Sequence, residues 1–313
     1  ATLVAAHAAG ADAVKLQTYT PDTITIDCDN EYFRMQDGLW AGKTLYQLYQ
    51  EAYTPWDWYP SLKVKAAELG IELFSSPFDH TAVDFLQAQT VPAYKIASFE
   101  IFDIPLIKKA ADCGVPIILS TGMATLAEIA EAVDACYSVG NSDIILLKCT
   151  SAYPAPIEQA NLAMMTQLRE QFKLPVGLSD HTMGSSVAVA AAALGAVMIE
   201  KHFILDKALG GPDAAFSMTP DEFAAMVRAV REVESAIGCA DYALPAEVAA
   251  MRALGRSLFV VADMEAGEVF TETNLRSIRP GAGLHPRYLP EILGKKASRK
   301  IARGTPLSKD DIA

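Results

Sequence analysis

The amino-acid sequence predicts an α/β fold, a (β/α)₈ barrel of the TIM type, followed by a small β-rich domain. Three observations lead to this prediction. Over residues 1–238, short apolar runs alternate with amphipathic helical stretches, which is typical of a parallel sheet covered by helices. Nearly every apolar run ends in a polar residue, at a fairly even spacing. Beyond residue 255, short strands broken by glycine and proline replace the helical pattern.

Seven barrel strands are visible in the sequence. They are expected at 11–19, 72–78, 93–98, 116–122, 144–151, 175–181 and 197–203, with helices between them, for example at 125–136 and 185–195. A closed barrel of this type needs eight strands. Because the sequence opens on an Ala-rich helical stretch, we expect the first strand of the barrel to lie upstream of Ala1.

The chain is expected to divide into three parts. Residues 1–238 form the barrel, residues 239–255 a helical linker, and residues 256–313 the small domain. A domain of about 60 residues buries little core by itself. We therefore expect it to lean on another surface, in its own chain or in a partner.

Composition and charge exclude several classes of protein. The 313 residues carry a net charge of -12, which disfavours binding to nucleic acid or to an anionic membrane. No apolar run approaches the roughly 20 residues that span a bilayer, and no secretory leader is visible. The five scattered cysteines indicate reduced thiols. These features predict a cytoplasmic protein.

An unusual aromatic segment, 31–59, separates the first two strands. It contains all three tryptophans, Trp40, Trp56 and Trp58. Such side chains either pack on the barrel rim or form a lid whose faces contact a sugar ring or a methyl group. Both interpretations stay open for Trp40, whereas packing is favoured for Trp58.

Lysines and serines near the strand ends predict an anion-binding pocket. Active sites of such barrels lie at the carboxyl ends of the strands, and ammonium and hydroxyl donors suit phosphate and carboxylate. The lysines are Lys15, Lys95, Lys148 and Lys201, and the serines are Ser75, Ser76, Ser98, Ser120, Ser151 and Ser179.

His181 and His202 end neighbouring strands and predict a divalent metal site. Two protein ligands leave positions for water and substrate, as a catalytic metal requires. Asp180 or Glu200 would orient a histidine. A Schiff base on Lys95 or Lys201 is the alternative, but it leaves the histidines without a role.

The direction of Lys201 follows from the alternation of side chains along a strand. Lys201 points opposite to its neighbours Glu200 and His202. We therefore expect it to pair with a carboxylate at the rim of the barrel.

Ordered motifs along essentially the entire chain resemble the sialic acid synthase family, which condenses phosphoenolpyruvate with acetamido sugars. The barrel motifs are KIAS (95–98), STGMATLAEI (120–129), GLSDHT (177–182), GAVMIEKHF (195–203) and GGPDAAFS (210–217). The C-terminal RSL, GEVFT, SIRPGAGL and LGKKA are similar to the antifreeze-like (SAF, β-clip) domain of that family.

The resemblance implies a metal-dependent transferase with phosphoenolpyruvate and an acetamido sugar as substrates and Mn²⁺, Mg²⁺ or possibly Co²⁺ as cofactor. It places Lys15, Ser76, Lys95, Ser98, Ser120 and Ser179 at phosphoenolpyruvate, and Gln17, Tyr153, Asp213 and Arg279 at the sugar. His181 and His202 match the metal ligands, and Glu200 an acidic residue beside them. Arg279 would reach the partner's barrel in a domain-swapped homodimer.

Four segments, 38–58, 74–86, 94–107 and 148–156, are most similar to the branch of the family that forms pseudaminic acid. Its sugar would be 2,4-diacetamido-2,4,6-trideoxy-L-altrose. An N-acetylneuraminate or legionaminate synthase, acting on an N-acetylmannosamine-type sugar, is the alternative, and a sugar-binding protein without activity is a third class. The Glu-Ile-Gly motif of the family, whose glutamate handles proton transfer, is not found in residues 1–313, and we expect it in an omitted segment.

Overall fold

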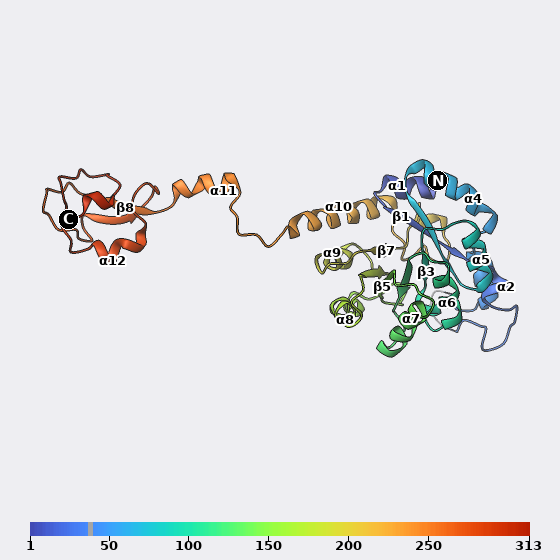
Figure 1. Cartoon of the computed structure of the whole chain (residues 1–313). Coiled ribbons are helices and arrows are strands. Elements are labelled where there is room, and N and C mark those ends of the chain that lie inside the picture. The colour runs from blue at the N-terminus through green and yellow to red at the C-terminus, as the bar shows by residue number, and fades with distance from the viewer. Residues whose placement is uncertain (37–39) are drawn as a thin grey trace. The chain divides into compact units, whose positions relative to one another are not determined.

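The computed structural model of the chain describes residues 1–36 and 40–313, which form two compact units, Ala1–Gly238 and Cys239–Ala313 (Figure 1). The aromatic segment predicted at 31–59, and the family-like stretch 38–58 within it, include residues 37–39. These residues lie outside the described part of the chain.

The first unit is built on one parallel sheet whose seven strands follow the order of the sequence. The strands are β1 (Ala13–Thr18), β2 (Glu72–Pro77), β3 (Tyr94–Ile96), β4 (Ile117–Ser120), β5 (Ile144–Cys149), β6 (Val176–Asp180) and β7 (Ile199–Lys201). All seven predicted strands are confirmed, each within its expected range.

Helices cover the outer face of this sheet (Figure 1). They are α1 (Thr2–Ala8), α4 (Tyr59–Leu69), α5 (His80–Ala88), α6 (Ile104–Asp112), α7 (Leu126–Ser138), α8 (Ala163–Phe172), α9 (Ser186–Ala193) and α10 (Pro220–Ile237). The connection between β1 and β2 also contains α2 (Pro21–Ile24) and α3 (Leu45–Ala52), which contact each other. Side chains at the N-caps define where several begin. Asp79 caps α5, Asp103 caps α6, and Thr125 forms a capping box with Glu128 at α7.

The two faces of the strands pack against different cores. Ile96, Leu119 and Leu146 belong to the large core between the sheet and its helices. The alternate residues Phe74, Ile118 and Leu147 form a small apolar cluster of their own, on the inner face. Residues that continue the second alternation toward the carboxyl ends therefore point into the barrel above this cluster.

The sheet is curled so far that its two end strands share a contact. Lys15 of β1 places its Nζ 2.7 Å from Oε1 of Glu200 on β7. Strands that are first and last in the sheet order therefore contribute to one interior. This is the barrel-like arrangement that the sequence predicts.

The second unit is small and rich in short extended segments. Helix α11 (Ala246–Met251) and the 3₁₀ turn η5 (Arg252–Leu254) lie where the helical linker is predicted. Strands β8 (Ser257–Val260) and β9 (Leu275–Ile278) pair antiparallel, and isolated bridges such as Met264 with Ile301 extend the pairing. The unit also contains α12 (Leu289–Ile292) and has its own core around Leu258, Phe270 and Leu307.

In residues 1–36 and 40–313, the structure contains no helix that is both long enough and apolar enough to span a membrane.

Candidate active site

Polar side chains from seven different segments meet above the inner apolar cluster. Alternation along each strand directs them inward, at the carboxyl ends where barrel sites form. They are Lys15 and Gln17 of β1, Ser76 of β2, Lys95 of β3, Ser120 of β4, Cys149 of β5, Ser179 of β6 with His181 just after it, and Glu200 of β7 with His202 just after it.

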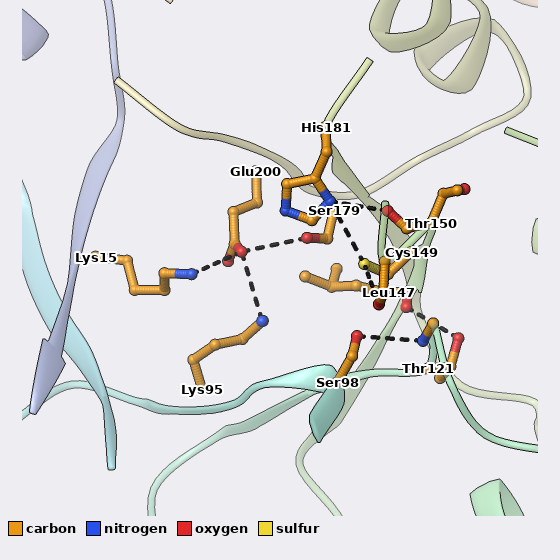
Figure 2. A network of polar contacts seen from close by, with 12 residues as sticks. Lys15, Lys95, Ser98, Thr121, Leu147, Cys149, Thr150, Ser179, His181 and Glu200 are labelled. Carbon is orange, nitrogen blue, oxygen red and sulfur yellow. Dashed lines mark hydrogen bonds and ion pairs between the residues drawn. The ribbon is translucent and has the colours of Figure 1, made fainter. Parts of the chain in front are cut away.

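Glu200 lies at the centre of this group (Figure 2). Its Oε1 accepts hydrogen bonds from Lys15 Nζ at 2.7 Å and from Ser179 Oγ at 3.3 Å. Lys95 Nζ is 3.5 Å from the same oxygen. The other carboxylate oxygen, Oε2, is buried and has no hydrogen-bond partner among the described residues. One carboxylate thus holds two ammonium groups together inside the barrel.

The charges in this group strongly affect one another. Burial by itself would raise the pKa of Glu200, but the charges of Lys15 and Lys95 outweigh it and hold the pKa well below the usual range. Burial lowers the pKa of Lys95 to about 8, although Glu200 opposes this effect. Near neutral pH Glu200 is therefore a carboxylate, and Lys95 is mainly an ammonium ion.

Serine hydroxyls lie at the same end of the barrel as the two lysines. The Oγ atoms of Ser76 and Ser120 are buried and have no hydrogen-bond partner among the described residues. Ser98, in the 3₁₀ turn η2 (Ser98–Glu100), accepts a hydrogen bond from the backbone N–H of Gly122 at 3.3 Å. A Cβ at Gly122 would lie 2.5 Å from Ser151 Oγ and 3.0 Å from Ser98 Oγ. Because Gly122 has no side chain, the hydroxyls of Ser98 and Ser151 can both lie close to its backbone.

The two histidines are anchored in the same way. The Nδ1 of His181 lies 3.0 Å from the carbonyl oxygen of Thr150, and the Nδ1 of His202 lies 3.2 Å from Oδ2 of Asp213. Each Nδ1–H therefore donates outward, which leaves Nε2 as a lone-pair donor. The rings are 5.2 Å apart between centroids. Burial lowers the pKa of His202 despite Asp213, so the neutral, ligating form is favoured.

This donor set fits a divalent metal. Metal-binding histidines usually donate their second N–H to a carbonyl or a carboxylate, as both do here. Within the described part of the chain, no group of three or more His, Cys, Asp and Glu side chains is placed to hold a metal. The two histidines would supply two protein ligands, which leaves positions for oxygen ligands.

Aromatic side chains form one wall beside the histidines. Phe216 packs against both imidazoles, with centroid distances of 6.2 Å to His181 and 4.9 Å to His202. Tyr153 lies 4.6 Å from the His181 ring and 5.1 Å from the Phe216 ring. Trp40 lies 6.2 Å from Tyr153. We call these three residues, Trp40, Tyr153 and Phe216, the aromatic wall.

The three tryptophans have different environments. Trp40 belongs to the aromatic wall, whereas Trp56 donates a hydrogen bond to the carbonyl oxygen of Tyr19 and stacks 4.9 Å from Phe85. Trp58 is exposed. Trp56 thus packs on the barrel, and only Trp40 reaches the site.

Two of the four predicted pocket lysines do not belong to the site. Lys148 and Lys201 lie on the outer face of their strands, because each is one residue out of step with an inward residue. Lys148 donates to the carbonyl oxygen of Cys149 and to Thr150 Oγ1. Lys201 pairs with Asp180, so its predicted carboxylate partner is confirmed, but the pair is buried and not at a rim.

Ser75 is also wrongly assigned to the pocket. Its hydroxyl forms a 2.7 Å hydrogen bond with Thr18 Oγ1 on the outer side of β1 and β2. Ser76, the next residue, is the inward one. The sequence does not distinguish the two serines, because both faces of β2 are buried.

The residues predicted to contact a sugar are distributed over both units. Gln17 lies half-buried on the inner face of β1, and Tyr153 belongs to the aromatic wall. Asp213 lies beside His202, where it contacts the ring nitrogen. Arg279 is exposed and belongs to the second unit.

Glu100 is a partly buried carboxyl near the site that the sequence interpretation did not single out. It ends the turn η2, close enough to Lys95 for the lysine's charge to lower the pKa of its carboxyl. Burial raises its pKa to about 7, although Lys95 opposes the shift, and its Oε2 has no hydrogen-bond partner among the described residues. A carboxyl that titrates near neutral pH beside an anion pocket is suited to proton transfer. Its place only two residues after Ser98 was the available signal.

Comparison with known proteins gives two family matches. The model of the NeuB family matches residues 2–242, and the model of the SAF domain matches residues 255–313. The chain is 48% identical to the pseudaminic acid synthase of Helicobacter pylori over 312 residues, covering 99% of this chain and 92% of the relative. It is 36% identical to the N,N'-diacetyllegionaminic acid synthase of Legionella pneumophila, covering 97% and 86%.

A solved structure agrees with these matches. The N-acetylneuraminic acid synthetase of Leptospira borgpetersenii, determined with citrate, has a TM-score of 0.69 and 30% sequence identity. The similarity covers 81% of this chain and 85% of that one. It confirms the barrel fold.

Proposed function

This chain belongs to the NeuB family, and we propose that it condenses phosphoenolpyruvate with 2,4-diacetamido-2,4,6-trideoxy-L-altrose to give pseudaminic acid and phosphate. The similarity to a pseudaminic acid synthase over nearly the whole chain supports this choice of sugar. The reaction forms a carbon–carbon bond, which makes the protein a transferase.

One observation carries the proposal. Two histidines with anchored Nδ1 atoms lie beside a buried cluster of two lysines and one glutamate, all at the carboxyl end of one barrel. A metal polarises a carbonyl oxygen, and the lysines attract phosphate and carboxylate. The site thus combines the requirements of an aldehyde and of a phosphorylated acid.

Phosphoenolpyruvate would bind to the lysines and the serine hydroxyls. Lys15 and Lys95 supply the positive charge, and the free Oγ atoms of Ser76 and Ser120 supply hydrogen bonds. Ser98 and Ser179 complete the set of donors. Leaving a buried hydroxyl without a hydrogen-bond partner destabilises the folded protein. An anion that accepts hydrogen bonds from these hydroxyls removes this cost and is therefore bound favourably.

His181 and His202 would hold a divalent ion, Mn²⁺, Mg²⁺ or Co²⁺, through their Nε2 atoms. When bound, such an ion polarises the aldehyde oxygen of the sugar. Asp213 and the carbonyl of Thr150 keep both imidazoles in the ligating tautomer. The Asp213 carboxylate and the Thr150 carbonyl therefore influence the reaction only by orienting the two histidines.

The bond changes follow from these positions. The C3 carbon of phosphoenolpyruvate attacks the aldehyde carbon of the open-chain sugar, and positive charge develops at C2. Water adds to C2, and the tetrahedral intermediate expels phosphate to leave the 2-keto acid. Glu200 faces this centre with a fixed negative charge that stabilises the cationic C2.

Glu100 is proposed to accept the proton of the attacking water. Its pKa of about 7 makes both the acid and the base form accessible near neutral pH. The positive charge of Lys95 lowers the pKa of both Glu100 and Glu200.

The aromatic wall supports a deoxy sugar. Tyr153, Phe216 and Trp40 place apolar ring surface beside the histidines. A methyl group gains from such a surface, whereas a hydroxyl would lose its hydrogen bonds with water. Gln17 and Arg279 are proposed to bind polar groups of the sugar.

We further propose that the protein is a homodimer in which the second unit of one copy covers the barrel of the other. Exposed apolar side chains follow β3 to β6, among them Phe99, Met123 and Met183, and such a surface marks a contact with a partner. Residues 1–238 carry 29 acidic and 15 basic residues, against 9 and 11 in residues 239–313. Opposite net charges favour the association. Arg279 of the partner subunit would then complete the sugar site.

A cytoplasmic location is proposed from the cysteines. All five, Cys28, Cys113, Cys136, Cys149 and Cys239, are free thiols in the described part of the chain. Reduced thiols are normal in the cytoplasm.

A panel of sugars tests the proposed function. The protein is incubated with phosphoenolpyruvate, Mn²⁺ and one acetamido sugar at a time, and products are identified by mass spectrometry. The 6-deoxy L-altrose derivative should give a product larger by the mass of pyruvic acid. Product from an N-acetylmannosamine-type sugar alone would assign the legionaminate or neuraminate reaction. Borohydride trapping of a pyruvate adduct would instead indicate a Schiff-base aldolase.

A further inference from the structure

The loop after β7 carries the carboxylate that orients His202, and this loop is held from two sides. The Oδ2 of Asp213 lies 3.2 Å from His202 Nδ1. The carboxylate is nevertheless half-exposed, with 46% of its side chain accessible. Ordering an exposed side chain costs conformational entropy, so a fixed backbone favours a single carboxylate position.

The backbone on each side of Asp213 has a hydrogen-bond partner. The carbonyl oxygen of Asp213 accepts bonds from the backbone N–H of Ser217 at 3.1 Å and from its Oγ at 2.8 Å. The preceding carbonyl, that of Pro212, accepts a bond of 3.2 Å from the indole Nε1–H of Trp40. Together these bonds fix both peptide groups that flank the Asp213 Cα.

Trp40 comes from a distant part of the sequence. It lies 172 residues before Pro212, in the segment between β1 and β2. Its ring also lies 6.2 Å from Tyr153, which contacts the His181 ring. A single indole therefore reaches residues beside both histidines.

We propose that Trp40 is a positioning residue for the metal site: through Pro212 it holds the Asp213 carboxylate on Nδ1 of His202. The inference rests on the proposed function, because it requires His202 to bind the metal. Replacing a residue that orients a metal ligand typically lowers metal affinity 10- to 100-fold. Trp40 acts one step further away through a single hydrogen bond, so its effect should be smaller.

The test compares four variants by Mn²⁺ binding, measured from the free-ion signal in electron paramagnetic resonance. Trp40→Phe keeps an aromatic ring and removes the N–H donor, and it should weaken Mn²⁺ binding about 3- to 10-fold. Trp58→Phe, at an exposed tryptophan of the same segment, should leave it unchanged. Asp213→Ala should weaken it about 10- to 100-fold.

The double variant identifies the route of the effect. If Trp40 acts through Asp213, Trp40→Phe should cause no further loss in the Asp213→Ala background. Equal losses in both backgrounds would overturn the proposal, as would wild-type Mn²⁺ affinity in Trp40→Phe.

Hydrogen exchange separates this proposal from the proposed function. Amides 213–217 should exchange faster in Trp40→Phe than in Trp58→Phe, whether or not metal is present. Unchanged exchange would overturn the role of Trp40 alone. Faster exchange in a protein whose wild type binds no Mn²⁺ would overturn both the metal site and the role of Trp40 in it.

Discussion

Lys201 Nζ lies 2.9 Å from Oδ2 of Asp180, in an ion pair whose two side chains are 1% and 2% exposed. Asp180 precedes His181, and Lys201 precedes His202. The same Nζ donates to the carbonyl oxygen of Thr182 at 2.6 Å, and Asp180 Oδ1 accepts from the Thr182 N–H at 2.9 Å. The pair therefore connects the ends of β6 and β7 behind the two histidines.

Lys201→Met should strongly destabilise the first unit. It leaves the Asp180 carboxylate buried without its counter-charge, which costs about 3 to 5 kcal/mol. Denaturant unfolding measures the loss. Lys65→Met, at the exposed pair with Glu68, is the matched control and should change stability little. Equal losses in the two variants would show that the buried pair contributes nothing special.

Binding of phosphoenolpyruvate should weaken above about pH 8. Burial lowers the pKa of Lys95 to about 8, so its ammonium loses the proton, and with it the attraction for an anion, as the pH rises through that value. The measurement is kcat/KM for phosphoenolpyruvate against pH. Lys95→Arg stays charged and should move the basic limb to higher pH. An identical basic limb in both proteins would exclude Lys95 as its source.

The acid limb of the same profile should report Glu100. Its pKa is raised to about 7 by burial, so the carboxyl becomes a base only as the pH rises through 7, and kcat/KM should rise with it. Glu100→Gln should lower turnover and remove this limb. Glu131→Gln, at an exposed position on α7, should keep it. A limb that persists in Glu100→Gln belongs to another group.

Two inactive variants should restore activity when combined, if the site is shared between copies. His181→Ala damages the barrel site, and Arg279→Ala removes the arginine that the second unit supplies. Mixed dimers contain one barrel with both His181 and the partner's Arg279. The two proteins are unfolded and refolded together, and phosphate release is measured. No recovery in dimers of confirmed mixed composition would contradict the proposed exchange.

Most of the fold could be predicted from the sequence. Strands β2 to β6 are largely apolar runs bounded by turn residues, and this pattern follows from burial of both faces. The same property limited the prediction of the site. In β5, Leu147 and Lys148 are both buried, so composition does not indicate which of them faces inward, and Lys148 was wrongly placed in the pocket.

Glu100 and Phe216 were missed for a different reason. Both lie on segments that follow strands, where no periodicity fixes the direction of a side chain. The role of Phe216 depends on its contacts with the two histidines, and that of Glu100 on burial and on the nearby charge of Lys95. The contacts of Phe216 have no counterpart in local sequence.

Metal-dependent release of phosphate tests the proposed function most directly. Chelator-treated protein is mixed with phosphoenolpyruvate and the 6-deoxy acetamido sugar, and phosphate is measured before and after addition of Mn²⁺. Phosphate should appear only when sugar and Mn²⁺ are both present, and His181→Ala should release none while it retains the circular dichroism spectrum of the wild type. Unchanged turnover in chelator, or a near wild-type rate in His181→Ala, would contradict a metal-dependent condensation at these histidines.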